Sequence, residues 1–325
     1  MQICFNLCIY FTALSVCLNF MIKNHLIIAI FICIFSTLTN ASEHFSDHEQ
    51  FCLQQPEKDC LVYINERIEQ SELHSTRWYK AKSYLFDYYY DKNDYETLKI
   101  IVEPFAERDD LPEVFKVQAY FYYAKALHFY HDDERAKIYA NKALTDIKLM
   151  YDAFADPMRM LELANLQYVF GNKESAFQML LKTERKFGKS KDPIFNFELQ
   201  SNKANIYHAY GDLENARESR KKALDWILPT QHQGKIIVAQ GNLARTYQLL
   251  GQYDLAIKHY VDSLSYMVEG SDDIAKASHT LRLAEIYWQA KDNQQATKWF
   301  KTVKESDLNR NHKIVYEQLA TALTL

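Results

Sequence analysis

The sequence has few of the residues that tight turns require. Only 7 glycines and 6 prolines occur among its 325 residues. β-Sandwiches and β-barrels connect many short strands through such turns, so this scarcity argues against both folds and favours long helices. With 48% hydrophobic and 14% aromatic residues, the chain is too apolar to be disordered and long enough to bury a sizeable core. The sequence therefore predicts a folded, mostly helical protein.

An excess of positive charge is also missing. Lys and Arg total 38 against 42 Asp and Glu, which gives a formal net charge of −4. Domains that bind nucleic acid carry a basic footprint, so we expect no nucleic-acid partner. The run Tyr88–Tyr90 is accordingly interpreted as repeat packing rather than as a platform on which bases stack.

Motifs for catalysis and cofactor binding are not found in the sequence. It contains no glycine-rich phosphate loop, no Gly-x-Ser-x-Gly and no His-Glu-x-x-His. His44 and His48 are one helical turn apart, but two ligands near a frayed terminus make a poor metal site. We therefore expect a non-enzymatic protein with no cofactor and no metal.

The N-terminal segment has the features of a targeting signal. Residues 1–41 contain no acid and one clear base, Lys23, which precedes the apolar run 26–35. Small residues ending at Ala41 then give way to polar sequence, which predicts a signal peptide of residues 1–41, with its start possibly at Met21. The protein would be periplasmic or secreted. The alternative is an uncleaved anchor, since either apolar run is marginally long enough to span a bilayer, and the leader would then be the only membrane contact.

The distribution of cysteine agrees with export. Four of the six cysteines lie in the leader, which leaves Cys52 and Cys60 on either side of Pro56. A metal site would need more ligands than this pair supplies. A disulfide that closes so short a loop stabilises by about 2.5 kcal/mol in the chain-entropy model. We therefore predict a Cys52–Cys60 disulfide in an N-terminal helical cap of residues 42–76.

An internal repeat organises the rest of the chain. An alanine recurs every 40 residues, and a second alanine follows each one by twelve positions. These alanines are Ala124, Ala164, Ala204, Ala244 and Ala284, followed by Ala136, Ala176, Ala216, Ala256 and Ala296. Apolar residues around each alanine have helical spacing, and Gly171, Gly211 and Gly251 stand where the first helix of a unit must stop. Each unit is therefore predicted to be a helix hairpin that crosses at its alanines and stacks on its neighbours.

These units resemble the tetratricopeptide repeat (TPR). The family pattern is met by Leu243, Ala244, Tyr247, Gly251, Tyr253, Ala256, Tyr260 and Leu264. The resemblance covers about residues 77–310, with units longer than the usual length of about 34 residues. It implies an all-α fold, a right-handed α-solenoid of antiparallel helix hairpins with six TPR-like repeats. Residues 311–325 would form a C-terminal capping helix, or else begin a further segment.

The resemblance also implies a binding site for another protein or a peptide. In this family the first helices line the concave face, and two columns of side chains on them are expected to face the groove. These are Lys125, His128, Asn165, Tyr168, Asn205, His208, Arg245, Gln248, Glu285 and Trp288. Amide side chains can bond a peptide backbone, and the basic ones can bind a carboxylate.

Two functions are compatible with this sequence. The first is an exported scaffold that binds another protein in the periplasm. The second is the extracytoplasmic sensory segment of a membrane signalling protein, such as a diguanylate cyclase or a sensor kinase. Because no second apolar span and no Gly-Gly-Asp-Glu-Phe signature follow residue 41, only a truncated or split version of such a protein would fit.

Overall fold

The computed structural model describes residues 57–154, 156–230 and 232–323. The chain divides into two units at residue 46, and the description concerns the second, residues 47–325. The predicted leader, its cleavage site, His44, His48 and Cys52 lie outside the described residues. The signal peptide and the Cys52–Cys60 disulfide therefore stay predictions.

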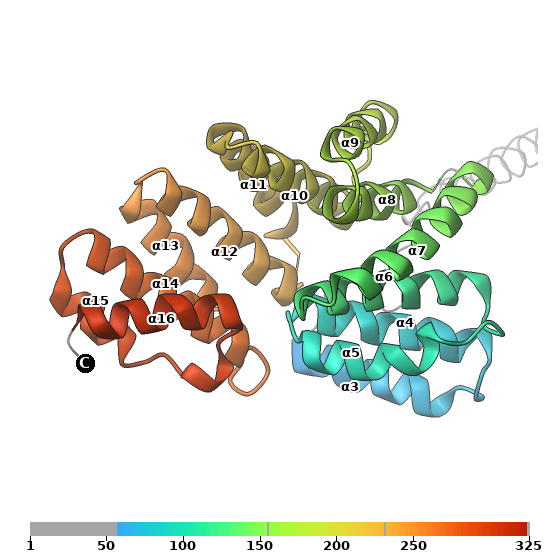
Figure 1. Cartoon of the computed structure of the whole chain (residues 1–325), viewed down its shortest axis with the longest axis horizontal. Helices are drawn as coiled ribbons and strands as arrows, with labels where there is room; N and C mark the ends of the chain where they lie inside the picture. Colours follow the sequence, from blue (N-terminus) through green and yellow to red (C-terminus); the bar gives the residue numbers. More distant parts are fainter. Residues whose placement is uncertain (1–56, 155, 231, 324–325) are drawn as a thin grey trace, which may run out of the picture. The chain divides into compact units, whose positions relative to one another are not determined.

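The described residues form α-helices and a short 3₁₀ turn, and no strand occurs in these ranges (Figure 1). Helix α3 (Glu57–Gln70) comes first, and α16 (Arg310–Ala322) comes last. Six pairs stand between them: α4 (Thr76–Asp91) and α5 (Tyr95–Ala106), α6 (Glu113–Phe129) and α7 (Asp133–Phe154), α8 (Pro157–Phe170) and α9 (Lys173–Phe187), α10 (Pro193–Ala209) and α11 (Leu213–Ile227), α12 (Gln233–Leu249) and α13 (Tyr253–Leu264), α14 (Asp273–Gln289) and α15 (Asn293–Phe300). This arrangement confirms the predicted all-α solenoid of helix hairpins.

All ten repeat alanines are buried at the contact between paired helices. None of them is more than 1% exposed. Two helices approach most closely where a side chain is small, so a methyl group at both crossing positions leaves the larger neighbours to fill the space beside it. The 40-residue spacing of alanine is therefore the spacing of helix crossings.

The turn within most pairs has a residue in the left-handed region. The φ angle is positive at Asn93 (57°), His131 (60°), Gly211 (77°), Gly251 (71°) and Lys291 (67°). A backbone hydrogen bond closes the turn each time; for example, the N–H of Asp212 donates to the carbonyl of Tyr207 at 2.9 Å. The same hairpin turn thus persists where glycine has been replaced, although a side chain at such a φ costs roughly 1 kcal/mol or more. Gly171 differs, since its φ is −130°.

Contacts between distant repeats hold the first pair against the fifth and sixth. Lys92, the residue that ends α4, forms an ion pair of 2.6 Å with Asp272, which precedes α14. The ammonium of Lys235 on α12 lies 3.1 Å from a carboxylate oxygen of Asp91 and 2.9 Å from one of Glu198. Among the described helices, none has both the length and the apolar character that crossing a membrane requires.

Candidate functional site

A groove of about 1180 Å³ runs along the inner face of the stack. Its walls come from α8, α10, α12 and α14, the first helices of their pairs, and from Tyr260 of the second helix α13. Residues 90–91, 93–96 and 128–131 bound one end, and residues 306–313 bound the other. The first helices therefore supply most of the helical lining of this groove.

Of the ten binding residues predicted from the sequence, some line this groove and others lie outside it. His128, Asn165, Asn205 and Arg245 line the groove. The remaining six do not line it: Lys125, Tyr168, His208, Gln248, Glu285 and Trp288. Tyr168 packs on the apolar cluster of α8 to α10, whereas Trp288 is 41% exposed elsewhere.

Several of these polar side chains bond to each other between neighbouring repeats. The ammonium of Lys125 donates to the side-chain oxygen of Asn165, whose amide donates to Asn202 at 2.6 Å. The guanidinium of Arg245 lies 3.3 Å from a carboxylate oxygen of Glu285, and the Gln248 amide donates to the same oxygen at 2.9 Å. These side chains cross-link adjacent first helices, so they are less available to a partner than the sequence suggested.

The charges of the buried ladder residues follow from their surroundings. Burial lowers the pKa of Lys125 to about 7, and the carboxylate of Glu198 opposes this shift. Although burial alone would raise the pKa of Glu285, the guanidinium of Arg282 at 2.7 Å and its other donors lower it below its usual value. Glu285 therefore stays ionised and holds two arginines, Arg245 and Arg282, along the groove wall.

The sequence reasoning missed a column of groove residues one helical turn earlier. Asn202, Asn242 and Arg282 line the groove, three positions before Asn205, Arg245 and Glu285. Residues three apart lie on the same helix face, so the spacing could have identified them. In the column four positions after the first alanine, only His128 lines the groove, and Tyr168, His208, Gln248 and Trp288 do not.

The ends of the groove carry opposite charge. Near the α4–α5 turn its lining contains Asp91, Asp94, Glu96 and Glu198, with Lys235 among them. At the other end it contains Arg245, Arg282, Arg310 and Lys313, with Asp307 among them. Burial, together with the charges of Arg282 and Arg245, lowers the pKa of His312 to about 4. The groove therefore offers an acidic end and a basic end to an extended ligand.

A close approach of α12 to α14 forms part of the floor. A Cβ atom at Gly241 would stand 2.4 Å from Nε2 of His279, so only glycine leaves room for this ring. The His279 ring packs against Tyr260 at a centroid distance of 5.1 Å. Burial lowers the pKa of His279 to about 3, so the imidazole is neutral, and its Nδ1 has no hydrogen-bond partner among the described residues.

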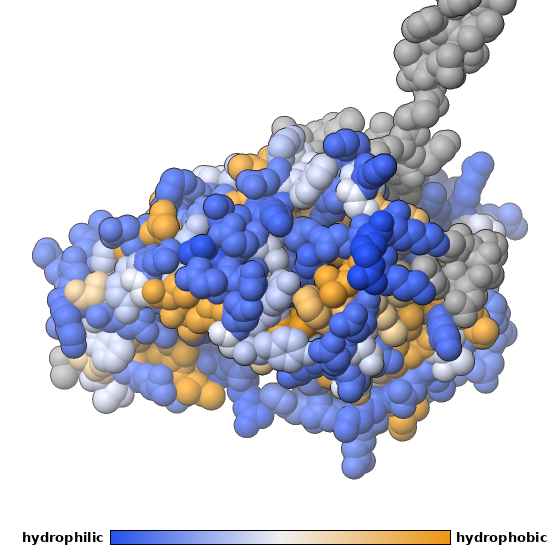
Figure 2. All heavy atoms as spheres, turned by 90° about the horizontal axis from the view of Figure 1, so that it is seen from above, coloured by the Kyte–Doolittle hydropathy of each residue, from blue (hydrophilic) through white to orange (hydrophobic). Residues whose placement is uncertain are grey.

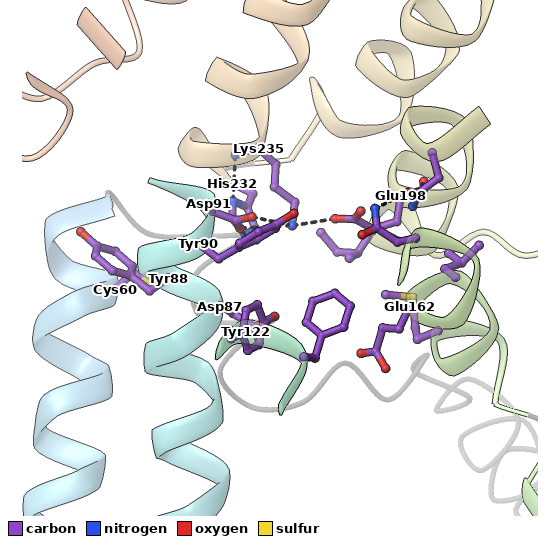
Figure 3. A pocket seen from close by; sticks show the side chains of 16 residues that line it. Cys60, Asp87, Tyr88, Tyr90, Asp91, Tyr122, Glu162, Glu198, His232 and Lys235 are labelled. Carbon is purple, nitrogen blue, oxygen red and sulfur yellow. Dashed lines mark hydrogen bonds and ion pairs between the residues drawn. The ribbon is translucent and has the colours of Figure 1, made fainter. Parts of the chain in front are cut away.

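A smaller cavity of about 130 Å³ adjoins the acidic end of the groove. Figure 3 shows Asp87, Tyr122 and Glu162 on one side of it, with Tyr90, Asp91 and Lys235 across from them. Its lining comes from α3, α4, α6, α8, α10 and the start of α12: Cys60, Asp87, Tyr88, Tyr90, Asp91, Phe121, Tyr122, Met158, Leu161, Glu162, Asn165, Ile194, Glu198, Asn202, His232 and Lys235. Aromatic rings and carboxylates dominate this lining.

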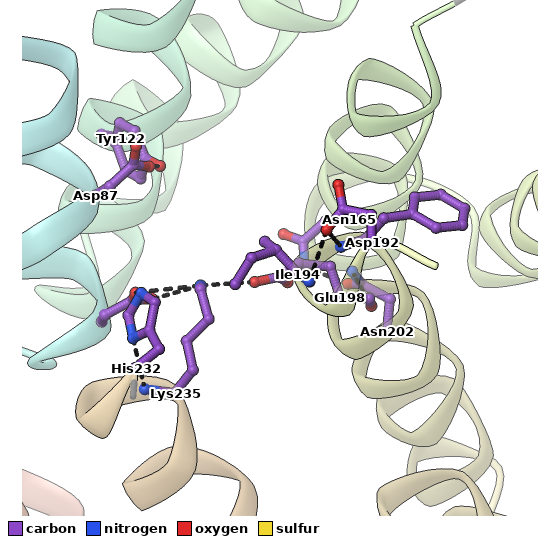
Figure 4. A network of polar contacts seen from close by, with 11 residues as sticks. Asp87, Tyr122, Asn165, Asp192, Ile194, Glu198, Asn202, His232 and Lys235 are labelled. Atoms are coloured by element: carbon purple, nitrogen blue, oxygen red, sulfur yellow. Dashed lines mark hydrogen bonds and ion pairs between the residues drawn. The ribbon is translucent and has the colours of Figure 1, made fainter. Parts of the chain in front are cut away.

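Polar contacts fix the side chains around this cavity (Figure 4). Lys235 bonds both Asp91 and Glu198, and these carboxylates raise its pKa well above the usual value against the opposing effect of burial. The hydroxyl of Tyr122 donates to Asp87. Burial lowers the pKa of His232 to about 3, so this imidazole contributes no charge near neutral pH.

One face of the molecule differs in character from the cavity lining. Figure 2 presents one face of the molecule, on which hydrophilic residues predominate and hydrophobic residues are interspersed among them. Scattered exposed apolar residues are normal for a protein surface and indicate no docking site. The inner groove and its adjoining cavity are therefore the better candidates for recognition.

Comparison with known proteins identifies the repeat. Residues 196–267 and 235–308 match the tetratricopeptide repeat family. The structure is similar to one from the APC/C hetero-tetramer Cut9–Hcn1, with 16% identity and a TM-score of 0.54 over 90% of this chain and 52% of that chain. It is also similar to BtubC from P. vanneervenii (16% identity, TM-score 0.48, 72% of this chain and 91% of that one). A tetratricopeptide repeat protein from Parabacteroides merdae is a third (12% identity, TM-score 0.47, 83% of this chain and 94% of that one). No curated protein matches the sequence. At 16% identity, the likeness to the Cut9–Hcn1 structure shows the fold alone.

Proposed function

Because residues 196–308 match the tetratricopeptide repeat family, we propose that this protein is a non-enzymatic scaffold that binds another protein or a peptide along its inner groove. Such repeats are typically non-catalytic and commonly bind proteins. The groove of about 1180 Å³ is long enough to take an extended segment across α8, α10, α12 and α14. Extended peptides expose backbone donors and acceptors, which polar side chains on rigid helices can satisfy.

The observation that carries this proposal is a pair of amide side chains. Asn205 on α10 and Asn242 on α12 both line the groove, and neither amide has a hydrogen-bond partner among the described residues. Each can donate two hydrogen bonds and accept others, which suits the alternating groups of a peptide backbone. By contrast, Asn165 and Arg245 bond neighbouring repeats and serve the solenoid as well.

Peptide selection followed by substitution tests the groove. Peptides that bind the protein would be selected from a random library, and their affinity would be measured by fluorescence anisotropy. Removing two amides that bond the ligand costs about 1–3 kcal/mol in total, so Asn205→Ala with Asn242→Ala should weaken binding about tenfold. Asn141→Ala, an exposed amide on α7 outside the groove, is the matched control. Unchanged affinity in a double variant that melts normally would move the binding site away from the groove.

We propose, further, that the protein acts outside the cytoplasm, as a periplasmic or secreted scaffold. The support is the leader of residues 1–41, with its acid-free apolar run and the small residues that end at Ala41. Mass spectrometry of the protein from its native host should find Ser42 at the N-terminus. A retained Met1 or Met21 would contradict cleavage. The family match and the structural neighbours do not favour the alternative of a sensory segment from a signalling protein.

A further inference from the structure

We propose that the cavity beside the groove binds an organic cation, an alkylammonium or guanidinium group, carried by a lysine or arginine side chain of the bound peptide. This inference rests on the proposed function, because it gives the groove a specificity pocket. It concerns the cavity of about 130 Å³ between α4, α6, α8, α10 and the start of α12.

The cavity is placed where a side chain of a peptide in the groove can enter it. Six residues line both spaces: Tyr90, Asp91, Asn165, Glu198, Asn202 and Lys235. The two spaces therefore share a wall. A cavity needs about 10–15 Å³ to hold one water molecule, so this one has room for a side-chain head group but not for a segment of backbone.

The charges in the lining favour a cation. Four carboxylates line the cavity, those of Asp87, Asp91, Glu162 and Glu198, against one lysine. That lysine, Lys235, is shared between Asp91 and Glu198, so a single positive charge faces two negative ones. The other basic residue in the lining, His232, is neutral because burial lowers its pKa.

The carboxylate of Glu162 shows how water-poor this wall is. Burial raises the pKa of Glu162 even though the guanidinium of Arg159 lies 2.5 Å away. Carboxylates held in such surroundings interact more strongly with an added positive charge than carboxylates in water do. A cation entering the cavity would stabilise the ionised form of this group.

Aromatic rings supply the second component of cation recognition. The rings of Tyr90 and Tyr122 lie 5.5 Å apart between centroids, and Phe121 lies 5.0 Å from Tyr122. A positive group within about 6 Å of a ring face is attracted by the ring quadrupole. The ammonium of Lys125 already takes such a position 5.5 Å from the Phe121 centroid, which leaves the tyrosine rings for a ligand. Carboxylates and aromatic rings around a small cavity together suit an ammonium or guanidinium head group.

Binding of small probes tests the cavity directly. The probes are Nα-acetyl-lysine methylamide and Nα-acetyl-arginine methylamide, with Nα-acetyl-norleucine methylamide as the uncharged isostere, titrated by NMR. A cationic probe should bind saturably and at least tenfold more tightly than the norleucine probe. Equal binding of charged and uncharged probes, or no binding of either cation, would overturn the inference, and this comparison needs no variant.

Two variants locate the binding. Asp87→Asn keeps the shape of a carboxylate without its charge and should lower the affinity for the cationic probes at least fivefold. Tyr90→Leu removes an aromatic ring and should lower this affinity by the same factor. Glu134→Gln, an exposed acid on α7 outside the cavity, is the matched control and should change nothing. Equal affinity in Asp87→Asn, Tyr90→Leu and the wild type, with melting temperatures preserved, would place the probe elsewhere and overturn the inference.

Competition between a groove-binding peptide and the probe tests whether the bound cation is a side chain of the peptide. If a groove-binding peptide displaces the probe, and loses this ability when its lysine or arginine is replaced by norleucine, the cation is a peptide side chain. Probe binding that no such peptide disturbs would overturn this source and leave a free organic amine as the ligand. If the probes fail while Asn205→Ala with Asn242→Ala still weakens peptide binding, the cavity inference falls and the groove proposal stands.

Discussion

Lys92 and Asp272 form a buried ion pair of 2.6 Å although 180 residues separate them. Their side chains are 5% and 2% exposed, so neither charge is solvated by bulk water. The second carboxylate oxygen of Asp272 accepts a hydrogen bond of 2.8 Å from the N–H of Val268. One carboxylate therefore ties the end of α4 to the turn before α14, and it closes the repeats around the groove.

Breaking this pair should destabilise the protein strongly. Lys92→Met leaves the charge of Asp272 buried without the lysine, which typically costs about 3–5 kcal/mol. Urea unfolding of the wild type, both single variants and the double variant Lys92→Met with Asp272→Asn measures the coupling. The double variant should lose less stability than the sum of the single losses, since it buries no unpaired charge.

Lys148→Met provides the comparison for this cycle, because Lys148 is exposed on α7. It should change the free energy of unfolding by no more than about 0.5 kcal/mol. Strictly additive losses in the Lys92 and Asp272 variants would mean that the two residues do not stabilise the fold through each other.

Enlarging a repeat alanine should disturb the crossing of its helix pair. Ala244 is fully buried, and Ala244→Leu forces three extra carbon atoms into a packed contact, at a cost of about 1–3 kcal/mol. Ala290→Leu adds the same atoms at an exposed position that ends α14, and should have little effect. Thermal denaturation followed by circular dichroism distinguishes them, and equal melting temperatures would rule out a tight crossing at Ala244.

The helix pairs could be predicted from the sequence because the packing that defines them is local and periodic. Ala204 and Ala216, twelve residues apart, are buried where the two helices of one hairpin cross. The next hairpin requires small residues at the same two positions. The left-handed turn residue could be predicted from the sequence only where it is a glycine, as at Gly251. At His131 and Lys291 the same positive φ is imposed on residues that give no such signal, because the flanking helices determine it.

The site was only partly predictable for a related reason. Helical spacing identifies which residues share a face, and Asn205 and Arg245, which hold the same position in successive units, both line the groove. It does not say how far that face turns toward the neighbouring helix, which is why Gln248 bonds Glu285 instead of lining the groove. Contacts such as Lys235 with Asp91 join distant repeats, and no repeat pattern encodes them, since they depend on the curvature summed over several units.

The two cysteines that follow the predicted leader should be oxidised. Cys60 is 3% exposed and packs in a cluster with Ile64, Leu85 and Tyr88, while Cys52 lies outside the described residues. A protein that begins at Ser42 contains only these two cysteines. Labelling of the denatured, unreduced protein should therefore detect no thiol, and reduction should lower the stability by about 2.5 kcal/mol. Two labelled thiols before reduction would refute the Cys52–Cys60 disulfide.

Lys125 should make the stability of the protein depend on pH above neutrality. Burial lowers its pKa to about 7, from 10.5 for an exposed lysine, with Glu198 opposing the shift. Between these two values the unfolded chain binds more protons than the folded protein, so the free energy of unfolding rises with pH. At about 1.4 kcal/mol per pKa unit, the full effect is on the order of 5 kcal/mol.

Replacing Lys125 by methionine should remove this dependence, because the side chain then has no proton to lose. The free energy of unfolding of Lys125→Met, relative to that of the wild type, should be highest at pH 6. This difference should decrease steadily as the pH rises toward 10. Loss of the hydrogen bond to Asn165 shifts the two stability curves by a constant, so the slope carries the information rather than the offset. Urea unfolding at unit intervals from pH 6 to pH 10 measures it, with Lys148→Met as the exposed control. Parallel curves for Lys125→Met and the wild type would mean that Lys125 keeps its proton in the folded protein, and that its ammonium remains a permanent charge behind the groove.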